Sequence, residues 1–418
     1  MKLKSLLIGS AAALVAVSGA RAADVVVADP EPVEYVRVCD AYGAGYFYIP
    51  GTQTCMKIGG YVRSDLKGGD NVYARSKSQK DRDTYAWRTR ATLNFSTATD
   101  TELGALRTFI QLRSEWQGGA EYGEANDNTS GQVRFAYIEL GGLRVGMDES
   151  IFNHWTGYFG NVLNDDIIDP LAYNRTNVIS YTYSADNGFS AIIGVEQGTN
   201  GSDNYGYRSY SYGPDRTDFK PVLTKGHKLD QQIDDYTPNV LAGVKFVQGW
   251  GGISLVGAYD AYYEEWAAKL RLDVNVTDKL SLWVMGGYKS GDDYYTLDGY
   301  SEKHKAYTVR RQNATMYGDW GGDWAVWGGG TYAFTPATSF NFQLTYDDVK
   351  TFSASANVKH EIVRGLTITP EVTYIQWNDS FGQKAKYDAA GMLTQEGIRT
   401  SLKGDNAVQG MVRLQRSF

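Results

Sequence analysis

The chain has 418 residues, of which 42% are hydrophobic, and it carries 41 basic against 48 acidic residues for a formal net charge of −7. This acidic balance argues against a nucleic-acid partner, which would call for a basic face. The chain contains 47 Gly and 31 Tyr but only 9 Pro, whereas a helical enzyme of this length would carry more Ala, Leu and Glu in periodic blocks.

The first residues have the order typical of a secretory signal peptide. Lys2 and Lys4 precede an apolar run over residues 6–17, and the small-residue pattern Ala20-Arg21-Ala22 follows it. The run is shorter than the ~20 residues of a membrane-spanning helix, and the flanking charge and cleavage pattern argue against a buried core helix. We therefore expect a signal peptide at residues 1–22 and a mature chain that begins at Ala23.

The rest of the chain contains no apolar stretch long enough for a membrane-spanning helix, and the mean hydropathy is −0.39. Because lipid admits only helices and closed barrels, a membrane role would require a β-barrel. Two cysteines, Cys39 and Cys55, remain after the signal peptide. In an oxidising compartment such a pair most simply forms one structural disulfide, and the scattered histidines do not suggest a metal site.

From about residue 56 onward, polar and apolar residues alternate with the period of β-strands. In residues 88–95 and 266–276, the apolar side chains fall on one face, and Arg, Lys, Asp and Asn fall on the other. A soluble sandwich also alternates, but its outer faces mix polar and apolar residues more loosely. Aromatic residues also gather at strand ends, as in the girdles of outer-membrane barrels; examples are Tyr85, Trp87, Phe95, Trp324, Trp327 and Phe334. We therefore favour a barrel.

Short and long connections alternate along the chain. We expect tight turns at 97–102, 141–142, 185–188, 248–252, 277–279, 335–338 and 364–365. We expect longer loops at 66–83, 116–131, 148–176, 197–238, 260–264, 289–322, 347–351 and 378–406. These connections would join sixteen strands, and a barrel of ~16 strands leaves an aqueous channel.

The last strand ends in a run of alternating residues that closes with Phe418 as the terminal residue. A final strand that pairs with the first removes both edges of the sheet. The predicted fold is thus an all-β, closed, sixteen-stranded antiparallel transmembrane β-barrel.

The segment from Cys39 to Arg63, with its Gly-x-Gly-x-Phe-Tyr-Ile-Pro-Gly run, Cys55 and the Ile-Gly-Gly-Tyr-Val-Arg sequence, resembles the opening of the alphaproteobacterial porins of the rhizobial and Brucella type. The resemblance extends over the mature chain to Phe418. It implies a trimeric general-diffusion porin whose third loop folds into the barrel. It also implies that Cys39 and Cys55 staple a periplasmic-side segment, residues 23–55, before a barrel at 56–418.

Such a protein performs no covalent chemistry, so its functional residues are those that set pore width and charge. The third loop follows the fifth strand and contains five acids and no basic residue in residues 148–170; the acids are Asp148, Glu149, Asp165, Asp166 and Asp169. The early strands carry cations on their polar faces, namely Lys57, Arg63, Arg88, Arg90, Arg107 and Arg113. We predict that these acids and cations face one another across a constriction. The alternative is that the acidic and basic side chains are only solvated and form no constriction. Calcium binding by the loop is disfavoured because the usual Asp spacing is absent.

Three other functions remain open from the sequence. A barrel hydrolase would need a Ser or Asp nucleophile with a positioned His, and His154, His227 and His304 have no evident local partner. A sugar-specific porin would carry an aromatic track in the lumen, for which Trp283 with Met285, or Trp324 with Val326, are candidates. The third alternative is a structural or adhesive envelope protein. No cofactor is implied.

The expected location is the bacterial outer membrane, reached through the periplasm. The expected partners are outer-membrane lipid and lipopolysaccharide, and the assembly machinery acting on the strand that ends in Phe418. The resemblance implies a homotrimer, which a patch of small and apolar outer-wall residues would allow; the patch comprises Ile58, Gly60, Val62, Val412 and Leu414. The loop at 116–131 would latch a neighbouring subunit.

Overall fold

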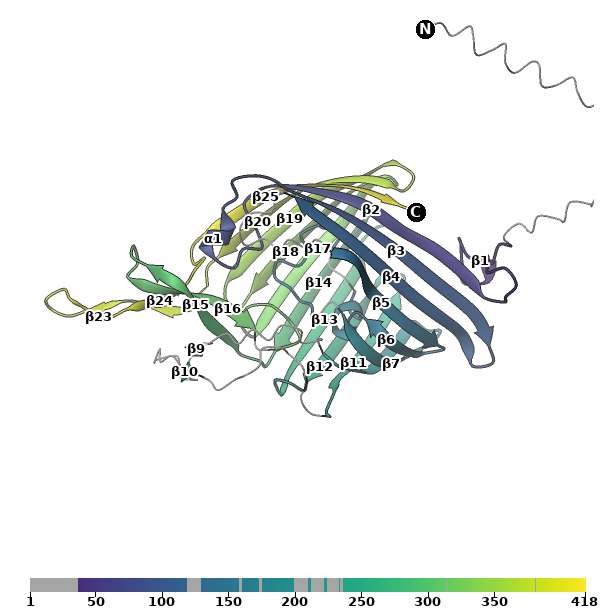
Figure 1. Cartoon of the computed structure of the whole chain (residues 1–418), viewed down its shortest axis with the longest axis horizontal. Coiled ribbons are helices and arrows are strands. Elements are labelled where there is room, and N and C mark those ends of the chain that lie inside the picture. The colour runs from purple at the N-terminus through teal and green to yellow at the C-terminus, as the bar shows by residue number, and fades with distance from the viewer. Residues whose placement is uncertain are drawn as a thin grey trace, which may run out of the picture.

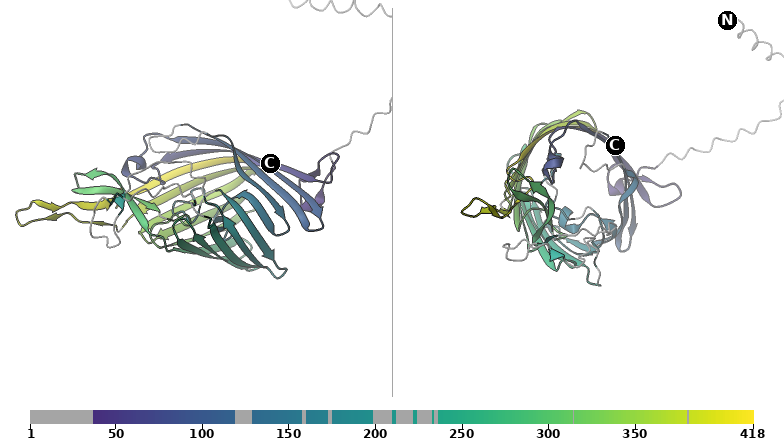
Figure 2. Two further views of the ribbon diagram at one scale, coloured as in Figure 1. Left: turned by 60° about the horizontal axis from the view of Figure 1, so that its bottom comes forward. Right: turned by 60° about the vertical axis from the view of Figure 1, so that its left-hand side comes forward.

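The computed structural model describes residues 37–118, 129–157, 160–172, 175–198, 210–211, 222–223, 233, 236–313, 315–379 and 381–418. Sixteen antiparallel strands form one closed barrel, in which each strand pairs with its neighbours along the chain and the last strand pairs with the first. The strands lie side by side at a common tilt (Figure 1) and form a ring when the barrel is seen nearly end-on (Figure 2).

The barrel strands are long at the start of the chain and shorter in its middle. They are β2 (Cys55–Gly69), β3 (Ala86–Thr101), β4 (Gly104–Gly118), β5 (Thr129–Leu140), β6 (Leu143–Asp148), β7 (Thr176–Ser184), β8 (Phe189–Glu196), β11 (Asn239–Gln248), β12 (Gly251–Asp260), β13 (Glu265–Asn275), β14 (Leu280–Lys289), β17 (Trp324–Thr335), β18 (Thr338–Asp347), β19 (Thr351–Val363), β20 (Leu366–Trp377) and β25 (Asn406–Ser417). The sixteen-stranded closed barrel predicted from the sequence is confirmed.

Short turns join the strands at one end of the barrel and longer loops join them at the other, as predicted. One turn was placed wrongly. The expected turn at 97–102 is instead strand as far as Thr101, and Thr97 pairs with Thr108 across the β3–β4 hairpin. Small polar residues occupy both faces of this stretch, so its sequence looks like a turn although its backbone remains in the ladder.

The barrel is apolar outside and polar inside, which is the reverse of a soluble protein. On β13 and β14, Leu270 and Val284 expose 49% and 52% of their surface on the outer wall, whereas Lys269 is 1% exposed inside. The predicted two faces of residues 88–95 and 266–276 are confirmed. The outer wall also exposes Ile58, Val62, Val412 and Leu414. Trp327 departs from the expected aromatic girdle, because it is 1% exposed and points into the barrel.

The seam between the first and last strands closes at a glycine. The N–H groups and carbonyls of Gly60 and Phe418 exchange two hydrogen bonds of 3.1 Å. Gly60 has a φ of +155°, and a Cβ on it would come within 2.1 Å of the Thr92 carbonyl oxygen. Only glycine permits this close approach of three strands, so it fixes the position at which the barrel closes.

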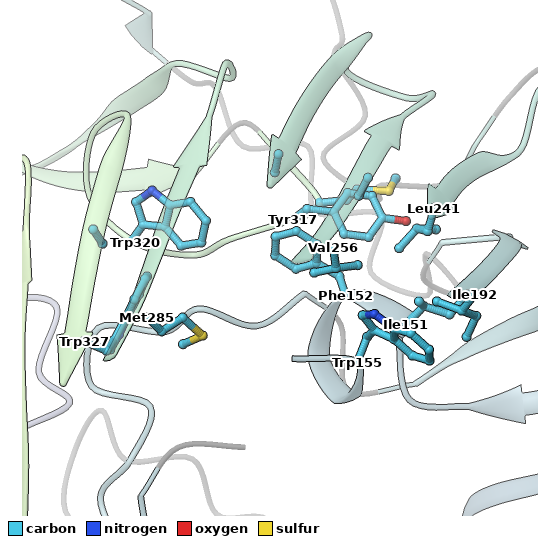
Figure 3. Close-up of a cluster of buried hydrophobic side chains, with 14 of the residues drawn as sticks. Ile151, Phe152, Trp155, Ile192, Leu241, Val256, Met285, Tyr317, Trp320 and Trp327 are labelled. Carbon is cyan, nitrogen blue, oxygen red and sulfur yellow. The ribbon is translucent and has the colours of Figure 1, made fainter. Parts of the chain in front are cut away.

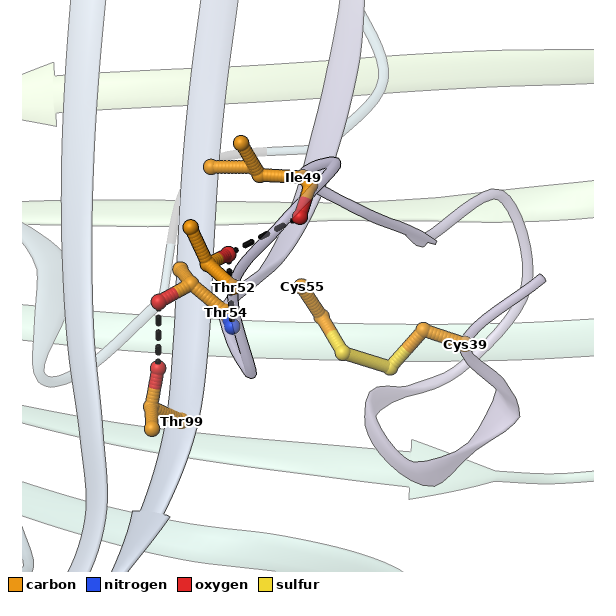
Figure 4. The surroundings of a disulfide bond; sticks show 6 residues. All are labelled: Cys39, Ile49, Thr52, Thr54, Cys55 and Thr99. Atoms are coloured by element: carbon orange, nitrogen blue, oxygen red, sulfur yellow. Dashed lines mark hydrogen bonds between the residues drawn. A yellow bond between two sulfur atoms is a disulfide. The ribbon is translucent and has the colours of Figure 1, made fainter. Parts of the chain in front are cut away.

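The segment before the barrel is held by a disulfide between Cys39 and Cys55, with a Cα–Cα distance of 6.1 Å (Figure 4). It contains the 3-10 helix η1 (Asp40–Tyr42) and the short strand β1 (Phe47–Tyr48), which pairs with the start of β2. The disulfide therefore lies at the short-turn end of the barrel. Residues 1–36, which include the expected signal peptide, lie outside the described residues.

The loop end carries further secondary structure. The first loop contains α1 (Lys77–Lys80), and the third contains α2 (Ile151–His154). A four-stranded sheet combines β15 (Asp293–Ser301), β16 (Ala306–Asn313), β21 (Gly382–Gln383) and β24 (Gly397–Thr400). Two further hairpins pair β9 (Tyr210–Ser211) with β10 (Val222–Leu223), and β22 (Lys386–Tyr387) with β23 (Leu393–Gln395). In the described part of the chain, no helix is long and apolar enough to cross a membrane.

Candidate functional site

The third loop, residues 149–175 and hereafter L3, begins with a short helix fixed to the inner wall. Glu196 on β8 accepts hydrogen bonds from the Ile151 N–H at 2.6 Å and from the Ser150 hydroxyl at 2.9 Å. Ser150 also caps α2, because its hydroxyl accepts a hydrogen bond from the Phe152 N–H. The carboxylate of Glu196 thus holds the first turn of α2 at the wall.

The apolar side chains of α2 pack onto the strands behind it. Ile151, Phe152 and Trp155 are at most 5% exposed, and they contact a cluster that includes Leu241 and Val256 of β11 and β12 (Figure 3). L3 therefore folds into the barrel, as the family resemblance implies, and packs apolar residues on the inner wall.

Two glycines make room for the helix on this wall. A Cβ at Gly194 would lie 2.4 Å from Ile151 Cδ1, and one at Gly243 would lie 2.5 Å from the Trp155 indole ring. Two lysines from the same wall lie over the aromatic rings: Lys245 Nζ is 4.3 Å from the Trp155 ring centroid, and Lys269 Nζ is 4.4 Å from that of Phe152. These cation–π contacts add to the apolar packing.

The second half of L3 is attached to a different part of the barrel wall, formed by strands nearer the C-terminus. Glu371 on β20 accepts hydrogen bonds from the Leu163 and Asn164 N–H groups at 2.5 and 2.7 Å. Gln343 on β18 donates to the Asp165 carbonyl at 2.8 Å, and Trp327 on β17 donates its indole N–H to the Ile168 carbonyl at 2.8 Å. L3 is therefore held at both ends, with α2 on the β8–β12 wall and residues 163–168 on the β17–β20 wall.

The aromatic residues considered for a solute track fall into two groups. Trp283 and Met285 do point inward, with exposures of 8% and 1%. Both lie against L3: Gly160 stands beside the Trp283 ring, and the Thr156 hydroxyl lies 3.9 Å from the Met285 sulfur. Trp324 and Val326 are instead on the outer wall. The inward pair thus supports L3 rather than lining an open path.

The five L3 acids occupy two different environments. At the start of the loop, Asp148 pairs with Arg144 at 2.7 Å, and the neighbouring Glu149 is buried. Burial raises the pKa of Glu149 to about 7. Asp165, Asp166 and Asp169 lie in the second half of the loop and are only partly buried.

The charges of this second group influence one another. Burial, and then the charge of Asp166, raises the pKa of Asp165 to about 8, while the nearby Arg413 acts in the opposite direction. Burial followed by the charges of Asp166 and Asp319 raises the pKa of Asp169 as well. Asp166 accepts a hydrogen bond of 2.6 Å from the Tyr73 hydroxyl of the first loop.

Four of the six predicted wall cations gather in one place. Arg63 on β2 is directly opposite Arg90 on β3 in the strand register, and Arg90 is opposite Glu115 on β4. Arg88 and Arg113 lie beside them, with ion pairs to Asp65 at 3.1 Å and to Glu115 at 3.7 Å, respectively. Arg90 Nε is in close contact with a Glu115 carboxylate oxygen. These residues form a charged patch on the inner face of β2–β4.

The structure adds four members to this patch that the sequence reasoning did not name. Arg413 on β25 binds Asp65 through two hydrogen bonds of 2.6 and 3.0 Å. Arg134 on β5 interacts electrostatically with Arg113, Arg90 and Glu115. Strand parity could have identified the acids, since Asp65 is two residues from Arg63 and Glu115 is two residues from Arg113. The arginine wall is defined here as Arg63, Arg88, Arg90, Arg113, Arg134 and Arg413.

Two predicted cations lie elsewhere. Lys57 donates a hydrogen bond of 3.0 Å to the Ala44 carbonyl, beside the disulfide-bonded segment. Arg107 is opposite Ala98 on β3 and Glu139 on β5 in the register. It is six residues from Arg113 on the same strand, which corresponds to a separation of about 20 Å. Both residues are at the short-turn end, outside the arginine wall.

The arginine wall and L3 interact electrostatically. Arg413 of the wall acts on Asp165, and Arg134 of the wall acts on Glu149, at opposite ends of the loop. Lys67 on β2 is a further cation that interacts with Asp166. Among the described residues, no group of three or more His, Cys, Asp or Glu side chains could hold a metal ion.

The barrel has an apolar outer wall, a polar interior and a loop held across its lumen. A sequence match decides to which protein family it belongs. Residues 24–411 match the model of a family described as the porin subfamily. The chain belongs to this porin family. Porin Omp2b of Brucella abortus (strain 2308) is 47% identical over 423 residues, and porin Omp2b of Brucella suis biovar 1 (strain 1330) is 46% identical; each match covers all of both chains.

The fold of the porin is shared by a distant solved structure. The outer membrane channel DcaP of Acinetobacter baumannii superimposes with a TM-score of 0.55 at 15% identity, covering 89% of this chain and 99% of that one. The porin is thus an outer-membrane channel for the passive diffusion of small hydrophilic solutes and not an enzyme. Its connections are long at one end of the barrel and short at the other, which is the asymmetry of bacterial outer-membrane barrels.

Proposed function

We propose that L3 and the arginine wall form a charged filter at the waist of the channel. The observation that carries the proposal is the uneven charge on two facing surfaces. The arginine wall holds six guanidinium groups against two carboxylates, Asp65 and Glu115. L3 contributes Asp166, joined by Asp165 and Asp169 when their carboxyl groups are ionised, and it has no basic residue of its own in this stretch. A solute that passes between them experiences a transverse field, which favours dipolar and charged solutes over apolar ones.

The attachment of L3 at both ends should also make selection depend on solute size. L3 is attached at Glu196 and at Glu371, so it has little freedom to move away from a passing solute. Two unit charges ~8 Å apart in water interact by only ~0.5 kcal/mol. Several charges on each side, in a lumen bounded by protein of low dielectric constant, act together and strengthen the field.

The test is the reversal potential of single channels in a potassium chloride gradient at pH ~9, above the Asp165 pKa of about 8. The variant Asp165→Asn/Asp166→Asn/Asp169→Asn should shift the selectivity of the porin toward anions. A matched variant, Asp100→Asn/Asp186→Asn/Asp278→Asn, removes the same number of acids at the short-turn end and should leave the selectivity close to that of the wild type. Equal reversal potentials for the L3 variant and the wild type would exclude L3 as the filter.

The proposal also covers the assembly of the porin. We propose a homotrimer that meets through the outer wall of β2 and β25, where Val62 and Leu414 are 49% and 43% exposed. Val62→Cys should give covalently linked pairs of subunits with a short thiol cross-linking reagent, whereas Ile193→Cys, on the outer wall of β8, should not. The second loop remains the proposed latch, although residues 119–128 lie outside the described residues.

The remaining partners and the division of the chain rest on the same family membership. We propose a signal peptide at 1–22, a periplasmic-side segment at 23–55 and a barrel at 56–418. We also propose contact with lipopolysaccharide around the barrel and recognition of the strand ending in Phe418 by the assembly machinery. Deleting Phe418 should lower the amount of heat-modifiable, folded porin in outer membranes without lowering its synthesis.

A further inference from the structure

The arginine wall presents its basic groups to the lumen and hides its acidic ones. The side chain of Asp65 is 0% exposed and that of Glu115 is 6% exposed. In contrast, the side chains of Arg63, Arg88, Arg90, Arg113 and Arg413 keep between 12% and 21% of their surface exposed. The carboxylates therefore lie beneath the guanidinium groups, and the surface that a solute meets is cationic.

The two acids satisfy only part of the hydrogen-bonding capacity of the wall. Each guanidinium offers about five N–H donors, and each carboxylate offers about four acceptor sites. Asp65 accepts three hydrogen bonds, two from Arg413 and one from Arg88. The buried Nε atoms of Arg88, Arg113 and Arg134 have no hydrogen-bond partner among the described residues. Most of the donors are thus left for water or for a bound anion.

Arg134 is the clearest case. It forms no ion pair or hydrogen bond within the described residues, although its Nε is buried beside the like charges of Arg113, Arg175 and Arg90, which Glu115 offsets only in part. A charged group that is partly removed from water and next to like charges is destabilised unless an anion joins it. The position of Arg134 therefore points to an occupant that brings negative charge from the lumen.

The register of the strands defines the kind of anion. Neighbouring strands lie about 4.8 Å apart, so the guanidinium groups form a row across five strands from β5 to β25. An oxyanion with two or more charged oxygens can accept hydrogen bonds from two neighbouring arginines at once, and Arg binds carboxylate and phosphate oxygens in this paired geometry. A monovalent anion can compensate only one charge of the row.

We propose that the arginine wall is a binding site for multivalent oxyanions, solutes that carry several phosphate or carboxylate charges. The inference rests on the proposed filter and adds its solute class. Such anions bind at the wall during passage, so that their permeation saturates and they obstruct the current carried by small ions. The acids of L3 face the same solute and favour its release toward either mouth.

The experiment is the block of potassium chloride current through single channels at about 0.1 M salt, where screening still leaves charge interactions over ~10 Å. Pyrophosphate is the phosphate probe, citrate the carboxylate probe and acetate the monovalent control, all at matched ionic strength. We expect pyrophosphate and citrate to reduce the current with saturation, and acetate to leave it unchanged. A block by one probe alone would restrict the class to phosphates or to carboxylates. Equal effects of acetate and the multivalent probes would overturn the site.

Variants then locate the block. Arg134→Gln removes a guanidinium without leaving an acid unpaired, and it should raise the half-blocking concentration by about tenfold, the factor that corresponds to ~1.4 kcal/mol. Arg107→Gln removes the same charge from the short-turn end and should leave this concentration unchanged. The double variant Arg90→Lys/Arg113→Lys keeps both charges but loses the paired hydrogen-bond geometry, and it should weaken the block as well.

The outcomes separate this inference from the filter itself. The open-channel conductance without probe and heat-modifiable migration establish that each variant is folded and inserted. If the wild type shows no saturable block but the L3 variant still shifts the reversal potential, the filter stands and the oxyanion site is wrong. If pyrophosphate and citrate block the Arg134→Gln channel at the same half-blocking concentration as the wild type, the site does not lie on the arginine wall.

Discussion

Glu371 offers the sharpest test of how L3 is held in the lumen. This carboxylate on β20 is 3% exposed and accepts hydrogen bonds from two L3 backbone N–H groups, those of Leu163 and Asn164. It also accepts one of 2.9 Å from Asn357. Glu371→Gln keeps the size of the side chain but replaces one acceptor oxygen with an N–H₂ donor. That donor must face at least one of the groups that now donate to Glu371.

The structure gives the expected magnitude. A hydrogen bond to a charged group contributes ~1.5–3 kcal/mol, so the loss of one of the two L3 contacts weakens this attachment by about that amount. Every ~1.4 kcal/mol changes the ratio of attached to detached loop about tenfold. In the variant, L3 keeps its contacts with Gln343 and Trp327 but is held less tightly than in the wild type. The barrel strands keep all their backbone pairing.

The assay is the open-channel current noise of single channels. Glu371→Gln should show frequent transitions between conductance levels as residues 163–168 leave the wall, with little change in the thermal stability of the barrel. The control is Glu361→Gln, which removes a similar carboxylate that accepts a hydrogen bond of 2.6 Å from the Gly365 N–H at a short turn. If both variants were as quiet as the wild type, Glu371 would not be the anchor of L3.

Three further predictions concern the pH response, the disulfide and the wall behind α2. Asp165 is neutral below its pKa of about 8, to which burial and then the charge of Asp166 raise it, and negative above it. Raising the pH from ~6 to ~9 should therefore shift the reversal potential toward cation selectivity, and Asp165→Asn should make that shift smaller. Reduction of Cys39–Cys55 should destabilise the segment it closes by ~3 kcal/mol, so that limited proteolysis cuts there while conductance persists. Gly243→Val should drive the Trp155 indole off the wall and lower the conductance; an unchanged conductance would contradict this packing.

The barrel could be predicted because its strands obey a local rule. Lipid on one side and water on the other impose alternation on each strand, and the polar turns interrupt it. The rule fails where small residues give no strong contrast between the two faces, which is why residues 97–101 looked like a turn although Thr97 pairs with Thr108. It also fails where protein replaces water inside the barrel. Trp327 looks like a girdle residue by type, but its indole N–H binds the Ile168 carbonyl of L3.

The site was harder to predict because it depends on the path of L3. The acidic composition of the loop and the cations of the early strands were visible in the sequence. Which acids face the open lumen was not visible, because Asp148 and Glu149 are taken up by Arg144 and Asn153 at the start of the loop. Arg413 was missed because it is distant in sequence, and only closure of the barrel brings β25 beside β2.

The arginine wall is best understood as an arrangement that the fold does not need. Arg63 and Arg90 stand directly opposite each other on paired strands, and like charges at such positions destabilise a sheet. Asp65 and Glu115 offset part of this repulsion, but from beneath the guanidinium groups, so they steady the row without neutralising the face turned to the lumen. Uncharged polar residues at these positions would pair equally well through the backbone. The remaining repulsion between the guanidinium groups is therefore relieved from the lumen, when a negatively charged solute passes the arginine wall.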